Sequence, residues 1–222
     1  MGYNINFPEI LPFLPLLLKG LVLSVAITTG GAVIGTLLGL FCAVARLSGI
    51  RPLTAAVNVY VEVIRNTPLL IQMYLVYFGL GQFGFHIPPI PAAIIAMTLN
   101  NGAYTAVIFE VGIKAVDAGQ REAALALGLT NAQTFRHVIL PPAFRIVFPP
   151  LVNQTISLFL FSAVASSISV PELTNQALYV DSVKWRTFEV FILTTVLYFA
   201  CTFVVTTMRS EEHTSELQSR HN

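Results

Sequence analysis

The chain has 222 residues, of which 55% are hydrophobic and 10% are charged, and its mean hydropathy is +0.74. So little polar surface cannot cover a soluble globule of this length, so the composition excludes a soluble domain and favours a membrane protein. The formal net charge of +1 gives no sign of nucleic-acid binding, and no nucleic-acid partner is expected. Cys42 and Cys201 lie in apolar runs without a CxxC pair, which predicts buried apolar side chains and neither a disulfide nor a metal site.

Uncharged stretches locate the membrane helices, since about 20 mostly apolar residues are needed to cross a bilayer. Four such stretches cover residues 20–45, 66–109, 146–171 and 190–208. The second is too long for one helix, and its middle, residues 81–89 (GQFGFHIPP), is rich in glycine and proline and predicts a turn. Splitting it gives spans that start near Pro68 and Pro91, so the sequence predicts an all-α polytopic protein with five transmembrane helices. Residues 10–18 are too short to cross and are expected to lie at the outer membrane interface.

Glycines in the first span follow the helical repeat. Gly31, Gly35 and Gly39 recur every four residues, which places them on one helix face and predicts a close helix–helix contact. A phosphate-binding loop is the alternative for a glycine-rich run, but the chain contains no GxxxxGK[ST] sequence. If the protein uses ATP, a separate polypeptide must therefore bind it, and no enzymatic activity is expected of this chain.

The stretch from residue 122 to residue 141, EAALALGLTNAQTFRHVILP, predicts two short polar helices in an otherwise apolar chain. The Glu-Ala-Ala sequence at its start favours a helix that begins near Glu122, and Gly128 is the residue type that ends helices in the left-handed conformation. Thr130 and Gln133 have the spacing of a capping box, which marks the start of the second helix. Leu140 and the two prolines after it are expected to stop that helix.

This stretch resembles the cytoplasmic loop of ABC-importer permeases, whose pattern is Glu-Ala-Ala, three residues, Gly, nine residues, Ile, any residue, Leu-Pro. The matching residues here are Glu122, Ala123, Ala124, Gly128, Leu140 and Pro141, with Val138 where Ile is usual. The resemblance implies that the first helix lies in a groove of a separate ATPase and moves as a rigid body when the ATPase dimer closes. The alternative is an ordinary surface hairpin in which Glu122 only caps a helix.

The resemblance extends over about residues 17–209. Residues 61–70 (VEVIRNTPLL), 99–104 (LNNGAY) and 149–154 (PPLVNQ) are similar to segments of the five-helix permeases for polar amino acids. Membership of that family implies a permease dimer, of identical or different subunits, in a bacterial inner membrane. It also implies a cytoplasmic ATPase dimer and an extracytoplasmic solute-binding protein as partners.

Lysine and arginine indicate the orientation. If the loop at about residues 117–142 is cytoplasmic, five crossings place the N-terminus outside and the C-terminus inside. Eight basic residues then lie on the cytoplasmic side and three on the outside, in agreement with the positive-inside rule. The eight are Arg46, Arg51, Arg65, Lys114, Arg121, Arg136, Arg145 and Arg209, and the three are Lys19, Lys184 and Arg186. Residues 1–19 form the outer segment and residues 20–209 the transmembrane domain.

Polar side chains within the spans are costly in lipid and are candidates for lining a substrate path. The candidates are Asn100, Asn101, Tyr104, Asn153, Gln154 and Ser162, with Thr105, Ser157 and Ser166 beside them and Gln72, Tyr74 and Tyr77 as weaker ones. The alternative is that these groups join helices through hydrogen bonds worth about 1 kcal/mol each.

Several positions depart from the pattern of amino-acid permeases. Val107 stands where these permeases usually have Glu, and Glu110 stands where they often have Arg. Leu160 and Phe161 occupy the place of a frequent Lys-Asp pair. Either a partner subunit supplies the recognition or the solute is less polar, so a permease for another small solute remains an alternative.

An ion-coupled carrier is the rival class, because such carriers also place sparse polar residues at mid-membrane. It needs an ionisable residue deep in a span, and Glu110, near the end of the third span, is the only acid inside one. No GxSxG, HExxH or CxxC motif occurs and the four histidines are scattered, so no hydrolase, metal site or cofactor is expected. Residues 210–222 break from the apolar pattern and resemble a translated sequencing-adapter oligonucleotide, which predicts an artefactual polar tail.

Overall fold

The computed structural model describes the backbone of residues 4–219 and the side chains of residues 4–207, and within this range the chain is helical without a strand. The all-α prediction is confirmed. In chain order the helices are α1 (Leu14–Leu47), α2 (Arg51–Arg65), α3 (Leu69–Tyr74), α4 (Leu80–Gln82), α5 (Pro89–Lys114), α6 (Ala118–Ala126), α7 (Asn131–Thr134), α8 (Leu140–Phe161), α9 (Leu173–Lys184) and α10 (Thr187–Ser219). Shorter turns join them, namely 3-10 helices at Phe7–Glu9, Leu11–Phe13 and Ser162–Ile168 and π-helices at Leu75–Gly79 and Phe135–Ile139.

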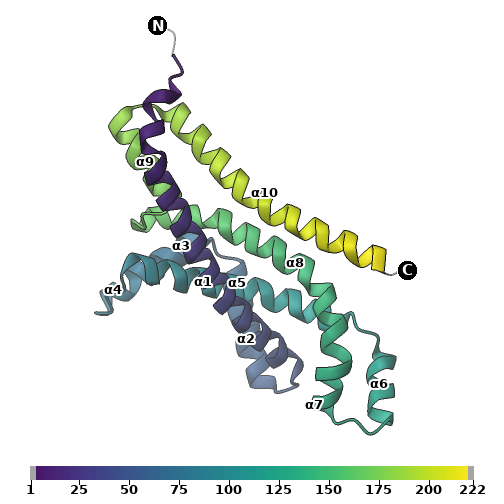
Figure 1. Ribbon diagram of the computed structural model, residues 1–222. Coiled ribbons are helices and arrows are strands. Elements are labelled where there is room, and N and C mark those ends of the chain that lie inside the picture. Colours follow the sequence, from purple (N-terminus) through teal and green to yellow (C-terminus); the bar gives the residue numbers. More distant parts are fainter. Residues whose placement is uncertain (1–3, 220–222) are drawn as a thin grey trace.

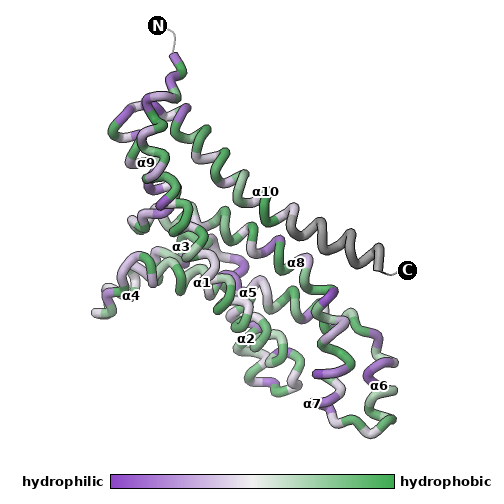
Figure 2. Tube along the Cα trace, viewed as in Figure 1, coloured by the Kyte–Doolittle hydropathy of each residue, from purple (hydrophilic) through white to green (hydrophobic). Residues whose placement is uncertain are grey.

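Four continuous helical stretches are long and apolar enough to cross a bilayer. They are Phe7–Leu47, Pro89–Lys114, Asn131–Ile168 and Thr187–Thr207, and Leu69–Gln82 is a shorter apolar helix between the first two. Four of the five predicted membrane helices are therefore long enough to cross, and the predicted second one is the shorter apolar helix Leu69–Gln82. Apolar residues predominate along α1, α8 and the described part of α10 (Figure 2). The predicted polar tail at 210–222 lies outside the residues whose side chains are described.

Helices α1 and α5 form the central contact of the bundle, and the glycine stripe makes it possible. A Cβ atom added to Gly35 would lie 2.9 Å from the carbonyl oxygen of Thr98, and one added to Gly39 would lie 2.8 Å from the backbone nitrogen of Ala106. Both positions are too close to a backbone atom for any side chain. The predicted packing role of these glycines is confirmed, because small residues let two helix backbones approach closely.

Helix α2 was not among the predicted elements. Its apolar residues Val57 and Val61 are buried between α1 and α5, while Arg51 and Glu62 on the opposite face are exposed. The Tyr60 hydroxyl donates a hydrogen bond to the carbonyl oxygen of Leu99 in the middle of α5, at 2.7 Å. The helix therefore begins beside the end of α1 and runs back into the bundle as far as the middle of α5.

Residues 10–18 are not a separate element, because α1 begins at Leu14 and includes the second half of that segment, and their location at the outer membrane interface stays a prediction. Ile10 and Leu17 are fully buried and pack with residues of α9 and the start of α10. This contact gives the segment an apolar surface to bury, which the sequence alone did not reveal. The α9 contact lies at one end of the molecule, and the α6–α7 hairpin lies at the other (Figure 1).

Candidate functional site

The first helix of the α6–α7 hairpin (residues 117–139) begins earlier than predicted. Asp117 is its N-cap, and the Asp117 carboxylate accepts a hydrogen bond from the backbone N–H of Gly119 at 2.6 Å. Glu122 is the fifth residue of the helix, so it lies neither at the N-terminus nor in a cap. The prediction that the helix starts near Glu122 is wrong, because an aspartate five residues upstream supplies the side-chain acceptor that a helix start needs.

The end of α6 agrees with the prediction. Gly128 has a φ angle of +85°, and its backbone N–H donates to the carbonyl oxygen of Leu125 at 3.0 Å. The N–H of Leu129 donates to the carbonyl oxygen of Ala124 at 3.2 Å, which completes a Schellman motif. Glycine is required at 128 because residues with a Cβ atom rarely adopt a positive φ.

The second helix of the hairpin begins as predicted and ends differently. Thr130 and Gln133 form a capping box, in which each side chain accepts from the other residue's backbone N–H. Helix α7 then continues through a π-helical turn into α8, so the prediction that Leu140 and Pro141 stop the helix is wrong. The Leu140 N–H donates to the carbonyl oxygen of Phe135, five residues back. Pro141 follows directly and has no backbone N–H, so it needs no hydrogen-bond acceptor at this turn.

The predicted ATPase-coupling residues lie on an exposed surface. Glu122, Ala123, Gly128 and Pro141 are exposed, Leu140 is half-buried and Ala124 is buried inside the hairpin. The neighbouring Leu127 is 81% exposed, so the surface is apolar as well as charged. A cavity of about 570 Å³, lined by the ends of α1 and α5 and by residues of the hairpin, lies between the hairpin and the bundle.

Glu110 near the end of α5 is held in an ion-pair cluster. Its two carboxylate oxygens lie 2.6 Å from Nη1 of Arg46 and 2.7 Å from Nζ of Lys114. The Arg46 Nε donates to the Asn58 side chain at 2.6 Å, so the cluster joins α1, α2 and α5. Glu110 is paired with two cations near the end of a span, so its contacts are those of a residue that holds helix ends together. An ion-coupled carrier would instead need an ionisable residue in the middle of the membrane.

Two of the predicted pathway residues join α5 to its neighbours. Nδ2 of Asn101 donates to the carbonyl oxygen of Ala32 in α1 at 3.1 Å, and the Oδ1 atom of Asn101 is buried without a hydrogen-bond partner. Nδ2 of Asn100 donates to Oε1 of Gln72 at 3.1 Å. Both asparagines are buried, so their contacts are those of helix-bridging groups, and their part in a substrate path stays a prediction.

The remaining predicted pathway residues differ in their exposure and described contacts. Tyr104 is half-buried with the Arg65 guanidinium 5.3 Å from its ring centroid. In α8, Asn153 is exposed and Gln154 is half-buried. Ser162 is fully buried, and its hydroxyl donates to the carbonyl oxygen of Phe159 at 2.6 Å.

Gln72 has a larger structural role than its sequence context indicated. It is 5% exposed, and its amide nitrogen donates to the carbonyl oxygens of Ile64 at 2.8 Å and Thr67 at 3.0 Å. Ile64 is in the last turn of α2, whose carbonyl groups have no partner within the helix, and Thr67 lies in the link to α3. The sequence indicated Gln72 only as a weaker candidate for the substrate path, and the signal that could have identified its structural role is Pro68, which separates α2 from α3.

Glu172 is a fully buried acid that sequence reasoning missed because it lies between two spans. Its carboxylate caps α9 through the backbone N–H groups of Thr174 at 3.0 Å and Asn175 at 2.8 Å. It also accepts from the hydroxyls of Ser24 at 3.2 Å and Tyr198 at 3.0 Å, which ties α1, α9 and α10 together. Burial raises the pKa of Glu172, and the four hydrogen bonds oppose that rise.

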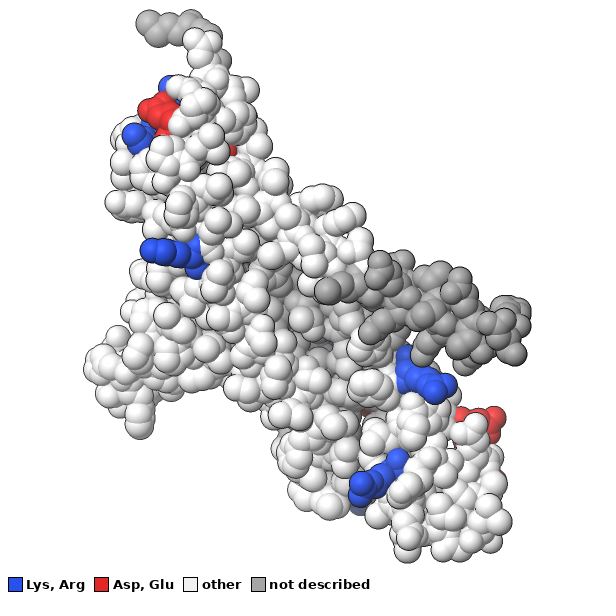
Figure 3. Space-filling model, in the orientation of Figure 1, with Lys and Arg blue, Asp and Glu red and all other residues white. Residues whose placement is uncertain are grey.

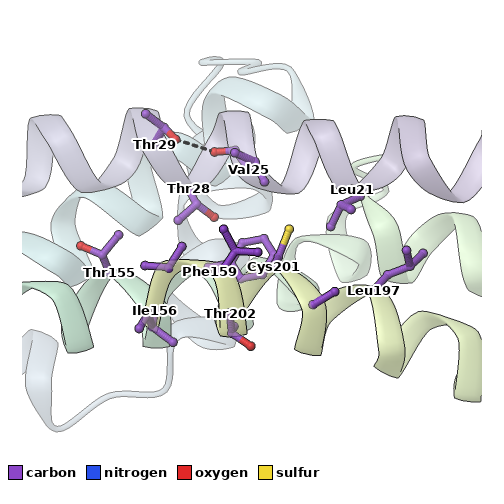
Figure 4. A pocket seen from close by; sticks show the side chains of 13 residues that line it. Leu21, Val25, Thr28, Thr29, Thr155, Ile156, Phe159, Leu197, Cys201 and Thr202 are labelled. Carbon is purple, nitrogen blue, oxygen red and sulfur yellow. Dashed lines mark hydrogen bonds between the residues drawn. The ribbon is translucent and has the colours of Figure 1, made fainter. Parts of the chain in front are cut away.

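An apolar cavity of about 450 Å³ lies between α1, α8 and α10 (Figure 4). The side chains of Leu21, Phe159 and Leu197 line it, and no charged residue is among its lining residues. Cys201 borders the cavity. The prediction of a buried side chain is confirmed for Cys42, whereas Cys201 is only half-buried. Without a charged group this cavity offers nothing to orient a zwitterion.

Charged residues are unevenly distributed over the surface. On the face seen in Figure 3, lysine, arginine and acidic side chains gather towards the N-terminal end and around the end that carries the hairpin. One further basic side chain lies at the left side below the N-terminal group, and the rest of the surface between the two ends shows no charged side chain on this face, as expected for a belt in contact with lipid (Figure 3).

Comparison with known proteins agrees with this architecture. Residues 35–210 match the family described as binding-protein-dependent transport system inner membrane component. The arginine transport system permease of Bacillus subtilis (strain 168) is 34% identical over 204 residues, which cover 91% of this chain and 93% of the relative. The glutamine transport system permease of Escherichia coli (strain K12) is 35% identical over 202 residues, which cover 90% and 92%.

Solved structures show the same relationship. A crystal structure of an amino acid ABC transporter with histidines superimposes with a TM-score of 0.89 at 40% identity, covering 94% of this chain and 97% of the other. An inward-facing methionine ABC transporter, MetNI, superimposes with a TM-score of 0.68 at 25% identity, covering 89% of this chain and 96% of the other. This multi-pass membrane chain therefore belongs to the family of binding-protein-dependent transport system inner membrane components, the permease subunits of ABC importers.

Proposed function

We propose that this chain forms half of the translocation pathway of an ATP-driven importer for polar amino acids. Relatives named for the transport of arginine, cystine and glutamine support this solute class. The working assembly contains a second permease subunit, identical or different, an ATPase dimer that supplies the energy, and a solute-binding protein that delivers the amino acid. It lies in a bacterial inner membrane, with residues 1–19 outside and residues 20–209 as the transmembrane domain.

The α6–α7 hairpin is the surface that the ATPase contacts on the cytoplasmic side. The observation that carries this assignment is that α6 is fixed at both ends, by the Asp117 cap and the Gly128 turn, while its Glu122 and Leu127 side chains are exposed. A helix with fixed ends transmits movement as a rigid body, and exposed apolar side chains give a partner something to bury. The N-terminus then lies outside, and the described basic residues near the hairpin follow the positive-inside rule.

Gly128→Val tests the hairpin. Valine at a φ of +85° is strained, so the Schellman turn should open and α6 should lose its fixed orientation. Co-purification of the ATPase and uptake should both fall. Gly84→Val is the matched control, because Gly84 also has a φ of +85° and open surroundings but lies in the turn between α4 and α5. Unchanged assembly and uptake in Gly128→Val would remove the hairpin from the coupling mechanism.

The solute class is tested with the complete transporter in proteoliposomes and a panel of L-amino acids. Uptake should require ATP and persist when the proton gradient is collapsed. The apolar residues Val107, Leu160 and Phe161 favour a second candidate, a permease for a less polar small solute, because they remove charges that a zwitterion would meet. Uptake that follows the proton gradient and ignores ATP would instead establish an ion-coupled carrier.

A further inference from the structure

The junction of α2 and α3 is a break in helical structure beside the middle of α5. Helix α2 ends at Arg65, and α3 begins at Leu69 after Pro68. Gln72 of α3 donates to the carbonyl oxygen of Ile64 in the last turn of α2 and accepts from Asn100, which is the twelfth residue of the 26 in α5. Interrupted helices of this kind occur where membrane proteins bind polar solutes, because irregular backbone is tolerated only inside protein or beside water.

Arg65 brings a positive charge to this break beside the middle of α5, which corrects the expectation that it lies on the cytoplasmic side with the other basic residues. Its guanidinium lies 5.3 Å from the ring centroid of Tyr104, ten residues before the end of α5 at Lys114. Ten helical residues span about 15 Å, so the guanidinium lies about half a bilayer core away from that end of the helix. A charge at such depth is costly in lipid, so it must face a hydrated cavity or a partner.

The Arg65 side chain is exposed and lacks an acid. Within residues 4–207, no acidic group lies within ion-pair distance of its guanidinium, and the Tyr104 ring is its described contact. A contact with the face of the Tyr104 ring uses none of the N–H groups of the guanidinium, which can therefore donate to a ligand. Carboxylates match the planar edge of a guanidinium with two parallel hydrogen bonds.

We propose that Arg65 binds the carboxylate of the transported solute as it passes the α2–α3 break, with Tyr104 holding the guanidinium in place. This inference rests on the proposed function, since it assigns a contact for the amino acids named there. It also supplies in this subunit a positive charge that Leu160 and Phe161 do not carry. The amides of Gln72 and Asn100 next to the break offer neutral contacts for the rest of the solute.

The test uses the complete transporter in proteoliposomes, with saturating binding protein loaded with the amino acid that the wild type takes up best. Uptake and ATP hydrolysis are measured in parallel for Arg65→Gln, Arg65→Lys and Arg51→Gln. Arg51 is the matched control because it is the first residue of α2, as Arg65 is the last, and is also exposed. Arg65→Gln should lower the solute moved per ATP about tenfold or more, because a charge-assisted contact is lost while the ATPase still responds. Arg65→Lys should recover only part of the loss, because an ammonium group keeps the charge but cannot form the two parallel hydrogen bonds, and Arg51→Gln should match the wild type.

Each other outcome has a definite meaning. Unchanged uptake in Arg65→Gln would overturn the role of Arg65 and leave the proposed function intact. A parallel loss of uptake, ATP hydrolysis and co-purified partners would also overturn it, because Arg65 would then hold the assembly together. If the wild type moves no amino acid while it hydrolyses ATP, the proposed solute class fails, and the carboxylate contact fails with it.

Discussion

The contact between α1 and α5, here called the seam, and the α6–α7 hairpin are stabilised in different ways. At the seam, Gly35 and Gly39 bring two helix backbones into contact, and the amide of Asn101 donates across it to α1. In the hairpin, the ends of α6 are closed by local hydrogen bonds, and most of its side chains are exposed. The seam therefore depends on shape across long sequence separations, whereas the hairpin depends on turn and cap chemistry within a few residues.

This difference matters for how each region can move. A close-packed seam resists change, because an added methyl group has no space and no polar group can leave without losing its partner. A hairpin fixed only by its own caps keeps its shape while its contacts with the bundle change. A hairpin that keeps its own shape while its contacts with the bundle change is suited to moving together with a bound partner protein.

The seam predicts the largest effect of a single methyl group. Gly39→Ala would place Cβ 2.8 Å from the backbone nitrogen of Ala106, which forces α1 and α5 apart. Overpacking of this kind costs about 1–3 kcal/mol. Gly30→Ala is the control, since its Cβ would lie 3.7 Å from Ile94, an ordinary contact, and alanine gains up to about 1 kcal/mol in a helix. The Tm measured in detergent should therefore fall for Gly39→Ala and rise for Gly30→Ala. Equal changes in Tm would show that α1 and α5 are not tightly packed at Gly39.

The N-cap of α9 is buried, so comparing it with the exposed N-cap of α6 tests how much burial adds to the stability that a cap contributes. Glu172 caps α9 as Asp117 caps α6, but Glu172 is fully buried and has two further hydroxyl donors. Glu172→Gln turns an amide NH₂ group towards at least one of the four N–H and O–H donors that the carboxylate now satisfies, which costs about 1–3 kcal/mol at a buried site. The variant should show a clearly lower Tm and a looser contact between α9 and α10.

The pH dependence of this effect has a defined sign. Because burial raises the pKa of Glu172, the folded protein binds more protons than the unfolded chain between the ordinary pKa and the raised one. The stability of the wild type relative to Glu172→Gln should therefore be greatest at low pH and decline as pH rises through the raised pKa. Tm values of both proteins across a pH series measure this difference, and a gap that widens towards alkaline pH would contradict it.

Local patterns in the sequence predicted most of the hairpin. The capping box at Thr130 and Gln133 and the left-handed turn at Gly128 depend on neighbouring residues, and both are present as expected. The start of α6 was missed because the prediction was based on the Glu-Ala-Ala pattern, and Asp117 lies before that pattern. The end of α7 was missed because a π-helical turn lets the chain pass Pro141, and no residue pattern announces such a turn.

The bundle was predicted less completely for a different reason. Glycine spacing located the seam, and uncharged runs located the spans. Helix α2, the capping role of Gln72 and the burial of Glu172 all depend on which helices become neighbours. Such pairings are set by packing over long separations, so the substrate-path candidates could be named by residue type without being placed.

Asn101→Ala separates packing from transport at the seam. The variant loses the hydrogen bond to α1, which is worth about 0.6–2 kcal/mol between membrane helices. If Asn101 only joins helices, Tm should fall by this small amount while uptake by the assembled transporter persists. A stable, assembled variant without uptake would place Asn101 in the substrate path. Asn153→Ala, in exposed α8 sequence, gives the corresponding test for the other candidate asparagine.

The smallest change in overall stability is expected at the exposed cap. Asp117→Ala removes the acceptor for the Gly119 N–H, and an N-cap of this kind contributes about 1 kcal/mol to its own helix. Because α6 shares little buried surface with the bundle, global unfolding should scarcely change, while hydrogen exchange of the first turn of α6 accelerates. Asp117→Asn keeps an acceptor and should restore protection. If Asp117→Ala instead lowered Tm as much as Gly39→Ala, the hairpin would be part of the cooperative core, and the idea that it moves as a separate lever would fail.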